Sequence, residues 1–157
     1  MGETIFFLLS RNNSPHSPII SPMTPNLGND LETDSRFPSG EWSGFWLQRP
    51  VYPGKQHMDL SLTFALGKVY GSGRDIIGEF TLNGRYDASS GKVTLHKQYL
   101  NAHLVLYEGW GEEGKGIWGV WKIDTQKDGF HLWPKNAPPE SEAKVAHTAE
   151  PAASASA

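Results

Sequence analysis

Apolar and polar residues alternate along most of the chain between Glu41 and Trp133. In the cleanest stretch, Met58–Leu66, a large apolar residue stands at every second position. Successive side chains of a strand point to opposite faces, so this alternation predicts strands with one buried face. Eight such runs occur, mostly joined by short connections that contain Gly, Asp or Asn, as a chain of hairpins requires. The runs are Trp42–Trp46, Met58–Leu66, Lys68–Gly73, Phe80–Tyr86, Val93–Tyr99, His103–Gly109, Ile117–Ile123 and Phe130–Trp133.

This spacing predicts an all-β fold, a single antiparallel eight-stranded up-and-down barrel that is closed or nearly closed. An open sandwich is the alternative. No window combines helical spacing of apolar residues with a helix cap and adequate length. Closure would benefit so small a domain, because it removes exposed strand edges.

Composition sets the limits of this domain. All six Trp and all five Tyr lie between Glu41 and Trp133, whereas nine of the eleven Pro lie outside that stretch. Only the middle segment therefore has the large side chains that a core needs. We expect an extended arm rich in Pro, Ser and Asn at residues 1–40, the barrel at residues 41–134, and a disordered tail rich in Ala, Ser, Pro and Glu at residues 135–157.

Charge and the N-terminal sequence exclude several classes of protein. The barrel segment has ten basic and ten acidic residues and no basic stripe, so no nucleic-acid partner is expected. The apolar run Ile5–Leu9 has five residues and no basic residue before it, too short for a secretory signal. It is either a strand-forming stretch without a further role or an arm that docks on another surface. Without a signal peptide, a transmembrane segment or Cys, the expected location is intracellular and cytoplasmic.

Two short motifs resemble known barrels. Gly40–Trp42 resembles the Gly-x-Trp that opens lipocalin and avidin-like (calycin) barrels, and Leu82–Asp87 resembles an avidin-family hairpin. The resemblance implies architecture, and no biotin-binding residue carries over to this chain. The longer pattern from Met58 to Trp121 is similar to a family of uncharacterised β-barrel domains, which implies a fold and no activity.

The candidate interior site depends on one hairpin. If Leu100–Ala102 is a three-residue loop, Tyr99 opposes His103, and Lys97 opposes Val105. We prefer this register because Leu100-Asn101 is a poor two-residue turn. A loop one residue different would move His103 to the other face.

In the preferred register, polar side chains point into the barrel. They are Lys97, Tyr99, His103 and Tyr107, with Asp75 joining them from the loop before the fourth strand. A buried Lys is costly unless it is paired. The set is therefore either a structural Lys97–Asp75 pair, with the His and Tyr side chains hydrogen-bonded around it, or a ligand site. Large side chains, Met58 and Phe64 among them, are expected to fill much of the interior.

Other candidate features are weaker. No cofactor or metal is expected, because the His residues show no short ligand spacing with a third donor. Gly109–Gly114 matches G-x-G-x-x-G only by letter, because it precedes a strand. We expect a hairpin loop there, with Trp110 at its tip as a contact residue, and outward-facing Trp118 and Trp133 forming an apolar patch for a partner or a covering arm.

Three functions remain open. The first is a non-catalytic barrel that binds a small ligand or a protein partner. The second is an accessory subunit of a larger assembly, or a homo-oligomer, anchored by the N-terminal arm, whose Ile19, Ile20, Met23 and Leu27 could cover a surface. The third is a small isomerase or lyase that uses Lys97 or His103 as base and a Tyr as acid. No nucleophile–base spacing supports catalysis, so the sequence favours a protein without enzymatic activity.

Overall fold

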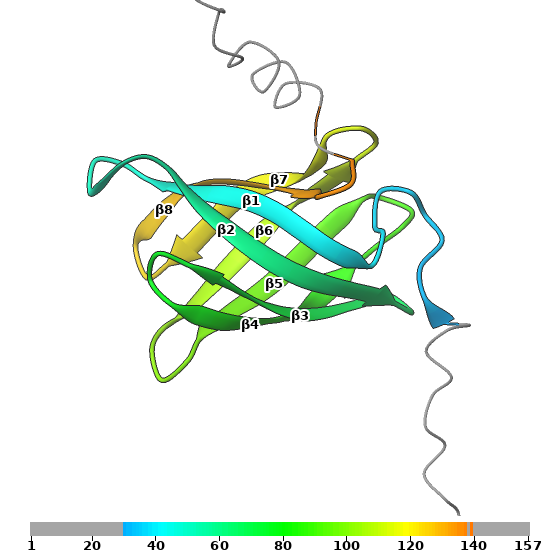
Figure 1. Cartoon of the computed structure of the whole chain (residues 1–157), viewed down its shortest axis with the longest axis horizontal. Helices are drawn as coiled ribbons and strands as arrows, with labels where there is room; N and C mark the ends of the chain where they lie inside the picture. The colour runs from blue at the N-terminus through cyan, green and yellow to red at the C-terminus, as the bar shows by residue number, and fades with distance from the viewer. Residues whose placement is uncertain (1–29, 138, 140–157) are drawn as a thin grey trace, which may run out of the picture.

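The computed structural model describes residues 30–137 and residue 139, and the chain there forms a closed barrel (Figure 1). Every strand pairs antiparallel with the next along the chain, and β1 pairs with β8 to close the sheet. The described strands are β1 (Gly40–Gln48), β2 (Tyr52–Ala65), β3 (Lys68–Asp75), β4 (Glu79–Tyr86), β5 (Lys92–Tyr99), β6 (Leu104–Glu112), β7 (Gly116–Ile123) and β8 (Gln126–Pro134). This confirms the predicted all-β, eight-stranded up-and-down barrel, an architecture compatible with a calycin-like fold.

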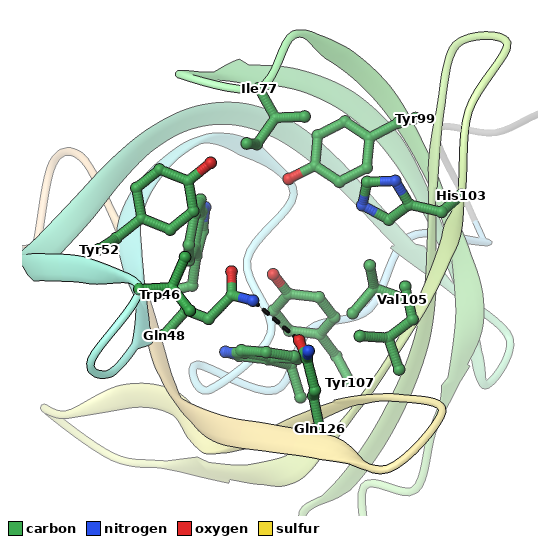
Figure 2. Close-up of a pocket in the computed structure, with 12 residues that line it drawn as sticks. Trp46, Gln48, Tyr52, Ile77, Tyr99, His103, Val105, Tyr107 and Gln126 are labelled. Atoms are coloured by element: carbon green, nitrogen blue, oxygen red, sulfur yellow. Dashed lines mark hydrogen bonds between the residues drawn. The ribbon is translucent and has the colours of Figure 1, made fainter.

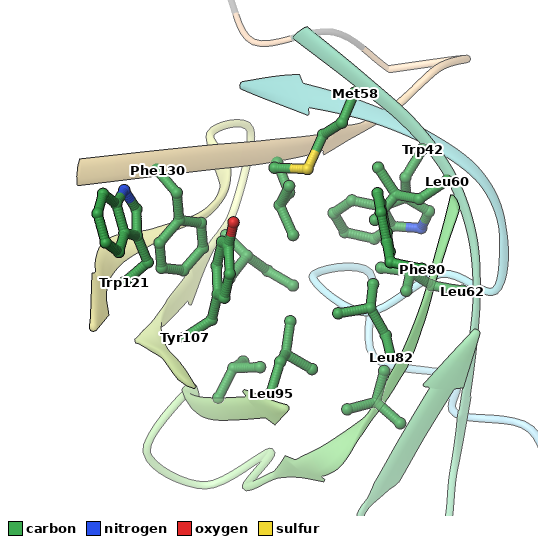
Figure 3. Close-up of a cluster of buried hydrophobic side chains, with 14 of the residues drawn as sticks. Trp42, Met58, Leu60, Leu62, Phe80, Leu82, Leu95, Tyr107, Trp121 and Phe130 are labelled. Carbon is green, nitrogen blue, oxygen red and sulfur yellow. The ribbon is translucent and has the colours of Figure 1, made fainter. Parts of the chain in front are cut away.

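Alternation along the strands decides what fills the barrel. In β5, for example, Val93, Leu95, Lys97 and Tyr99 are buried and the residues between them are not. The inward side chains of all the strands meet in one core (Figure 3). As expected, its large members include Met58, Phe64, Phe80, Trp121 and Phe130.

One end of the barrel is sealed by the segment that precedes β1. Phe37 is fully buried there, with its ring centroid 5.5 Å from that of Phe64 and 4.9 Å from that of Tyr86. Leu31 forms an isolated bridge with Ala65, and the Tyr86 hydroxyl donates to Glu32 Oε2 at 2.7 Å. Part of the segment predicted as an arm therefore belongs to the closed end. The proposed division into residues 1–40, 41–134 and 135–157 otherwise stays a prediction.

Two local expectations were wrong. β2 ends at Ala65, and Leu66, expected on the buried face, is 76% exposed in a turn with a left-handed φ of 49°. Trp110 does not sit at a loop tip but inside β6, where it faces Lys92 and Trp118, because that strand continues to Glu112. Within the described residues, no helix is long and apolar enough to cross a membrane.

Candidate functional site

A cavity of about 320 Å³ opens at the end of the barrel opposite Phe37 (Figure 2). Its walls are mainly aromatic and aliphatic, and its rim carries amide and imidazole groups. Strand ends from around the barrel build it, because these ends project past the filled core. The lining residues are Trp46, Gln48, Val51, Tyr52, Ile77, Tyr99, His103, Val105, Tyr107, Trp121, Ile123 and Gln126.

The floor of this cavity adjoins a buried ion pair. Lys97 Nζ lies 2.5 Å from Asp75 Oδ2, and the two side chains are 1% and 0% exposed. Asp75 Oδ2 also accepts hydrogen bonds from the Tyr99 hydroxyl at 2.6 Å and from Trp46 Nε1 at 3.0 Å. Asp75 is the last residue of β3, rather than part of the following loop. The predicted Lys97–Asp75 pair is therefore present at this position.

Burial and charge act against each other on this pair. Burial alone would raise the pKa of Asp75, but the Lys97 ammonium and hydrogen bonds from Lys97 and Tyr99 outweigh it and lower the pKa. For Lys97, burial dominates and lowers the pKa to about 8, although Asp75 opposes this change. Both groups are thus charged at neutral pH, so the ion pair is intact there.

The β5–β6 hairpin has the predicted three-residue loop. Lys97 pairs with Val105, and the Tyr99 amide donates to the His103 carbonyl at 3.2 Å. The His103 ring stands at the exposed mouth with its centroid 4.9 Å from that of Tyr99. The imidazole makes this ring contact instead of joining the hydrogen bonds around Asp75, so the structural network does not include it.

Tyr107 lies between the ion pair and the cavity. It is 4% exposed, and its hydroxyl oxygen is 3.5 Å from Lys97 Nζ, which donates to it. Burial, and then the negative charge of Asp75, raise the pKa of this phenol. Tyr107 therefore remains a neutral phenol at the inner wall of the cavity.

Several lining residues were not singled out from the sequence. The side chains of Gln48 and Gln126 meet across the mouth, with Gln48 Nε2 donating to Gln126 Oε1 at 2.9 Å (Figure 2). These residues are 78 positions apart and meet only because β1 closes on β8. No feature of the sequence indicated that the Trp46 indole donates a hydrogen bond to Asp75. Tyr52, an isolated aromatic residue beside Pro53, also had no feature in the sequence that pointed to a site.

The outer wall has a different set of aromatic residues. Trp110 and Trp118 face each other across β6 and β7 with ring centroids 6.4 Å apart, and they are 48% and 46% exposed. Trp133 differs from expectation, because it is only 8% exposed: its ring packs against Phe45 and His131. The exposed Trp pair therefore lies on β6 and β7 instead of β7 and β8. A partner-contact role for these Trp residues stays a prediction.

The described residues contain no group of three or more His, Asp or Glu side chains that could hold a metal ion. Comparisons of the chain with protein-family models, with curated proteins and with solved structures gave no match. The functional argument therefore rests on the geometry of the barrel.

Proposed function

We propose that the barrel binds a small, largely apolar ligand in the cavity at its open end, without catalysing a reaction. The observation that carries this proposal is the combination of about 320 Å³ of space with aromatic walls and a few polar groups. Small-molecule sites are typically concave and mostly apolar, with a small number of polar groups that orient the ligand. An eight-stranded barrel has room for packed side chains or for one small ligand, and this barrel has packing at one end and space at the other.

The two alternatives have less support. An isomerase or lyase would need an accessible and oriented base. The Lys97 amine is paired with Asp75 and does not line the cavity. His103 does line the cavity, but its ring contacts Tyr99 and no hydrogen bond from a described residue orients it. An accessory subunit anchored by its arm would depend on residues 1–29, including Ile5–Leu9 and Ile19 to Leu27, which lie outside the described residues. A protein partner on the exposed Trp110–Trp118 pair, a homo-oligomer and the cytoplasmic location remain predictions from the sequence.

The proposal is tested with 1-aminoanthracene, a neutral dye whose emission rises in apolar surroundings. Val105 is buried in the cavity wall, so Val105→Trp should fill the cavity and weaken dye binding at least about tenfold. Thr81→Trp is the matched control, because Thr81 is exposed on the outside of β4. Fluorescence titration of the full chain measures both variants.

Saturable binding by the wild type and by Thr81→Trp, with loss in Val105→Trp, supports the proposal. Absence of binding by the wild type, or undiminished binding by folded Val105→Trp, would overturn it. If Val105→Trp does not fold, Ile123→Trp fills the same cavity from the end of β7.

A further inference from the structure

The cavity wall contains a buried hydroxyl with an unused hydrogen atom. The Tyr107 oxygen accepts a hydrogen bond from Lys97, but no acceptor for the Tyr107 hydrogen lies among the described residues. The neighbouring Tyr99 differs, because its hydroxyl donates to Asp75 at 2.6 Å. Figure 2 shows Tyr107 among the side chains that surround the cavity. A buried donor without a partner is costly, so a ligand that supplies an acceptor has a specific advantage here.

Lys97 occupies the acceptor side of this hydroxyl. Its ammonium nitrogen lies 3.5 Å from the Tyr107 oxygen, so the oxygen faces a donor and the hydrogen is the part of the hydroxyl left to bind a ligand. Because burial raises the pKa of Tyr107, the phenol keeps its proton at neutral pH and donates at all times.

The charges nearby determine which acceptor fits. Lys97 is already neutralised by Asp75, and both side chains are almost completely buried. A ligand carboxylate beside Tyr107 would therefore add a buried negative charge near Asp75 with no cation to balance it. A neutral carbonyl oxygen accepts the hydrogen bond without that cost.

The walls determine the remainder of the ligand. Trp46, Tyr52 and Trp121 present aromatic rings to the cavity, and Val105 and Ile123 add aliphatic surface. Such walls favour a flat, ring-containing compound that buries apolar area on both faces. Building on the proposed function, we infer that the cavity takes a neutral cyclic or aromatic carbonyl compound whose carbonyl oxygen accepts a hydrogen bond from Tyr107.

The test compares 2-acetylnaphthalene with 2-isopropenylnaphthalene, which has the same shape but a CH2 group in place of the oxygen. Each compound displaces 1-aminoanthracene from the wild type, from Tyr107→Phe and from Tyr70→Phe. Tyr70 is the control, because it lies on β3 and is 39% exposed. The affinity ratio in each protein contains the difference in hydration between the two compounds, and this difference cancels when the ratio in a variant is compared with the ratio in the wild type.

Tyr107→Phe should lower the preference for the ketone about fivefold to tenfold, as loss of one hydrogen bond implies. Tyr70→Phe should leave the preference unchanged. If the ratio of ketone affinity to alkene affinity is equal in the wild type and in Tyr107→Phe, the inference is overturned. The proposed function then still stands, provided that the dye binds. Failure of the dye to bind the wild type would instead overturn the proposed function.

A second measurement does not depend on Tyr107→Phe folding. Prodan is a neutral naphthyl ketone whose emission moves to longer wavelength when its carbonyl accepts a hydrogen bond. Prodan bound to the wild type should emit at a wavelength typical of a hydrogen-bonding solvent. Emission from the wild-type complex as in an aprotic apolar solvent would contradict the hydrogen bond.

Discussion

Lys97 is a charged residue within the core of the barrel, and it is only 1% exposed. Removing an ammonium group from water costs several kcal/mol, so the surroundings must replace its hydration. Asp75 supplies the opposite charge. Lys97 Nζ also lies over the Phe80 and Tyr99 rings, 4.1 and 4.7 Å from their centroids. Cation–π contacts of this kind add stabilisation where water is excluded. The lysine is therefore tolerated because several groups compensate it together.

This compensation predicts strong coupling between Lys97 and Asp75. Asp75→Asn leaves the ammonium buried without its counter-charge and should lower the free energy of unfolding by about 3–5 kcal/mol. Combining it with Lys97→Met removes both charges, so the double variant should be more stable than Asp75→Asn alone. Urea unfolding at pH 7 measures the free energy of unfolding of the single and the double variant. A double variant as unstable as Asp75→Asn would show that the charge pair is not the source of the loss.

At the scale of strands, the sequence predicted which residues face the interior wherever local chemistry sets the register. The placement of Lys97 and Tyr107 on the inner face follows from period-two alternation and one hairpin loop, in which Asn101 adopts a left-handed φ of 56°. The loop length was predicted because Leu100-Asn101 is a poor two-residue turn, and Asn tolerates the left-handed conformation found there better than most residues. The Gln48–Gln126 contact could not be predicted from the sequence, because it depends on barrel closure.

Trp133 shows a second limit of strand-level reasoning. Its phase along β8 differs from that of the core residue Leu132, as alternation predicts. Its exposure depends on which side chains stand beside it on the outside of the barrel. Phe45 of β1 and His131 cover it, and Phe45 is adjacent only because β1 pairs with β8. Alternation predicts a face of the sheet, but it does not predict what covers that face.

Close approach of strands explains why β4 contains a glycine in its inward phase. Gly84 lies between the buried residues Leu82 and Tyr86, and a Cβ there would be 1.9 Å from the Thr94 carbonyl oxygen of β5. That distance is far below van der Waals contact. Even the smallest side chain would therefore push β4 and β5 apart.

We expect Gly84→Ala to lower the free energy of unfolding by about 3 kcal/mol or more, because the clash is with backbone. Gly129→Ala is the matched control: a Cβ at Gly129 would meet its nearest atoms at 3.8 Å, and its φ is not left-handed. This control should change the stability by less than about 1 kcal/mol. Thermal or urea unfolding distinguishes the two, and equal effects would contradict the close approach of β4 and β5.

Across the whole molecule, the two ends of the barrel have different roles. Phe37 and its neighbours fill one end, whereas the other end keeps a cavity above the ion pair. The sequence indicated neither the sealing role of Phe37, which lies in a Ser- and Pro-rich stretch, nor the empty space, which depends on the sizes of side chains from most of the strands. A barrel that is packed at one end and open at the other has a stable base for a preformed cavity.

Buried phenols at both ends predict how the stability of the barrel depends on pH. Burial, and then hydrogen bonding to Glu32, raise the pKa of Tyr86 to about 12, and burial also raises the pKa values of Tyr99 and Tyr107. A phenol in the unfolded chain titrates near pH 10. Above about pH 10 the unfolded chain therefore releases protons that the folded barrel retains, so stability falls by up to about 1.4 kcal/mol per pH unit for each phenol.

Lys97 has the opposite effect on stability, over a lower pH range. Its pKa of about 8 in the barrel lies below its unfolded value, so it adds stability as the pH rises from about 8 to about 10. The free energy of unfolding, measured with urea from pH 8 to pH 11.5, should therefore hold or rise slightly to pH 10 and then fall steeply. Tyr107→Phe should reduce that fall by the contribution of one phenol, about 1.4 kcal/mol per pH unit. Stability that stays constant from pH 10 to pH 11.5 would mean that these phenols are not protected by the barrel.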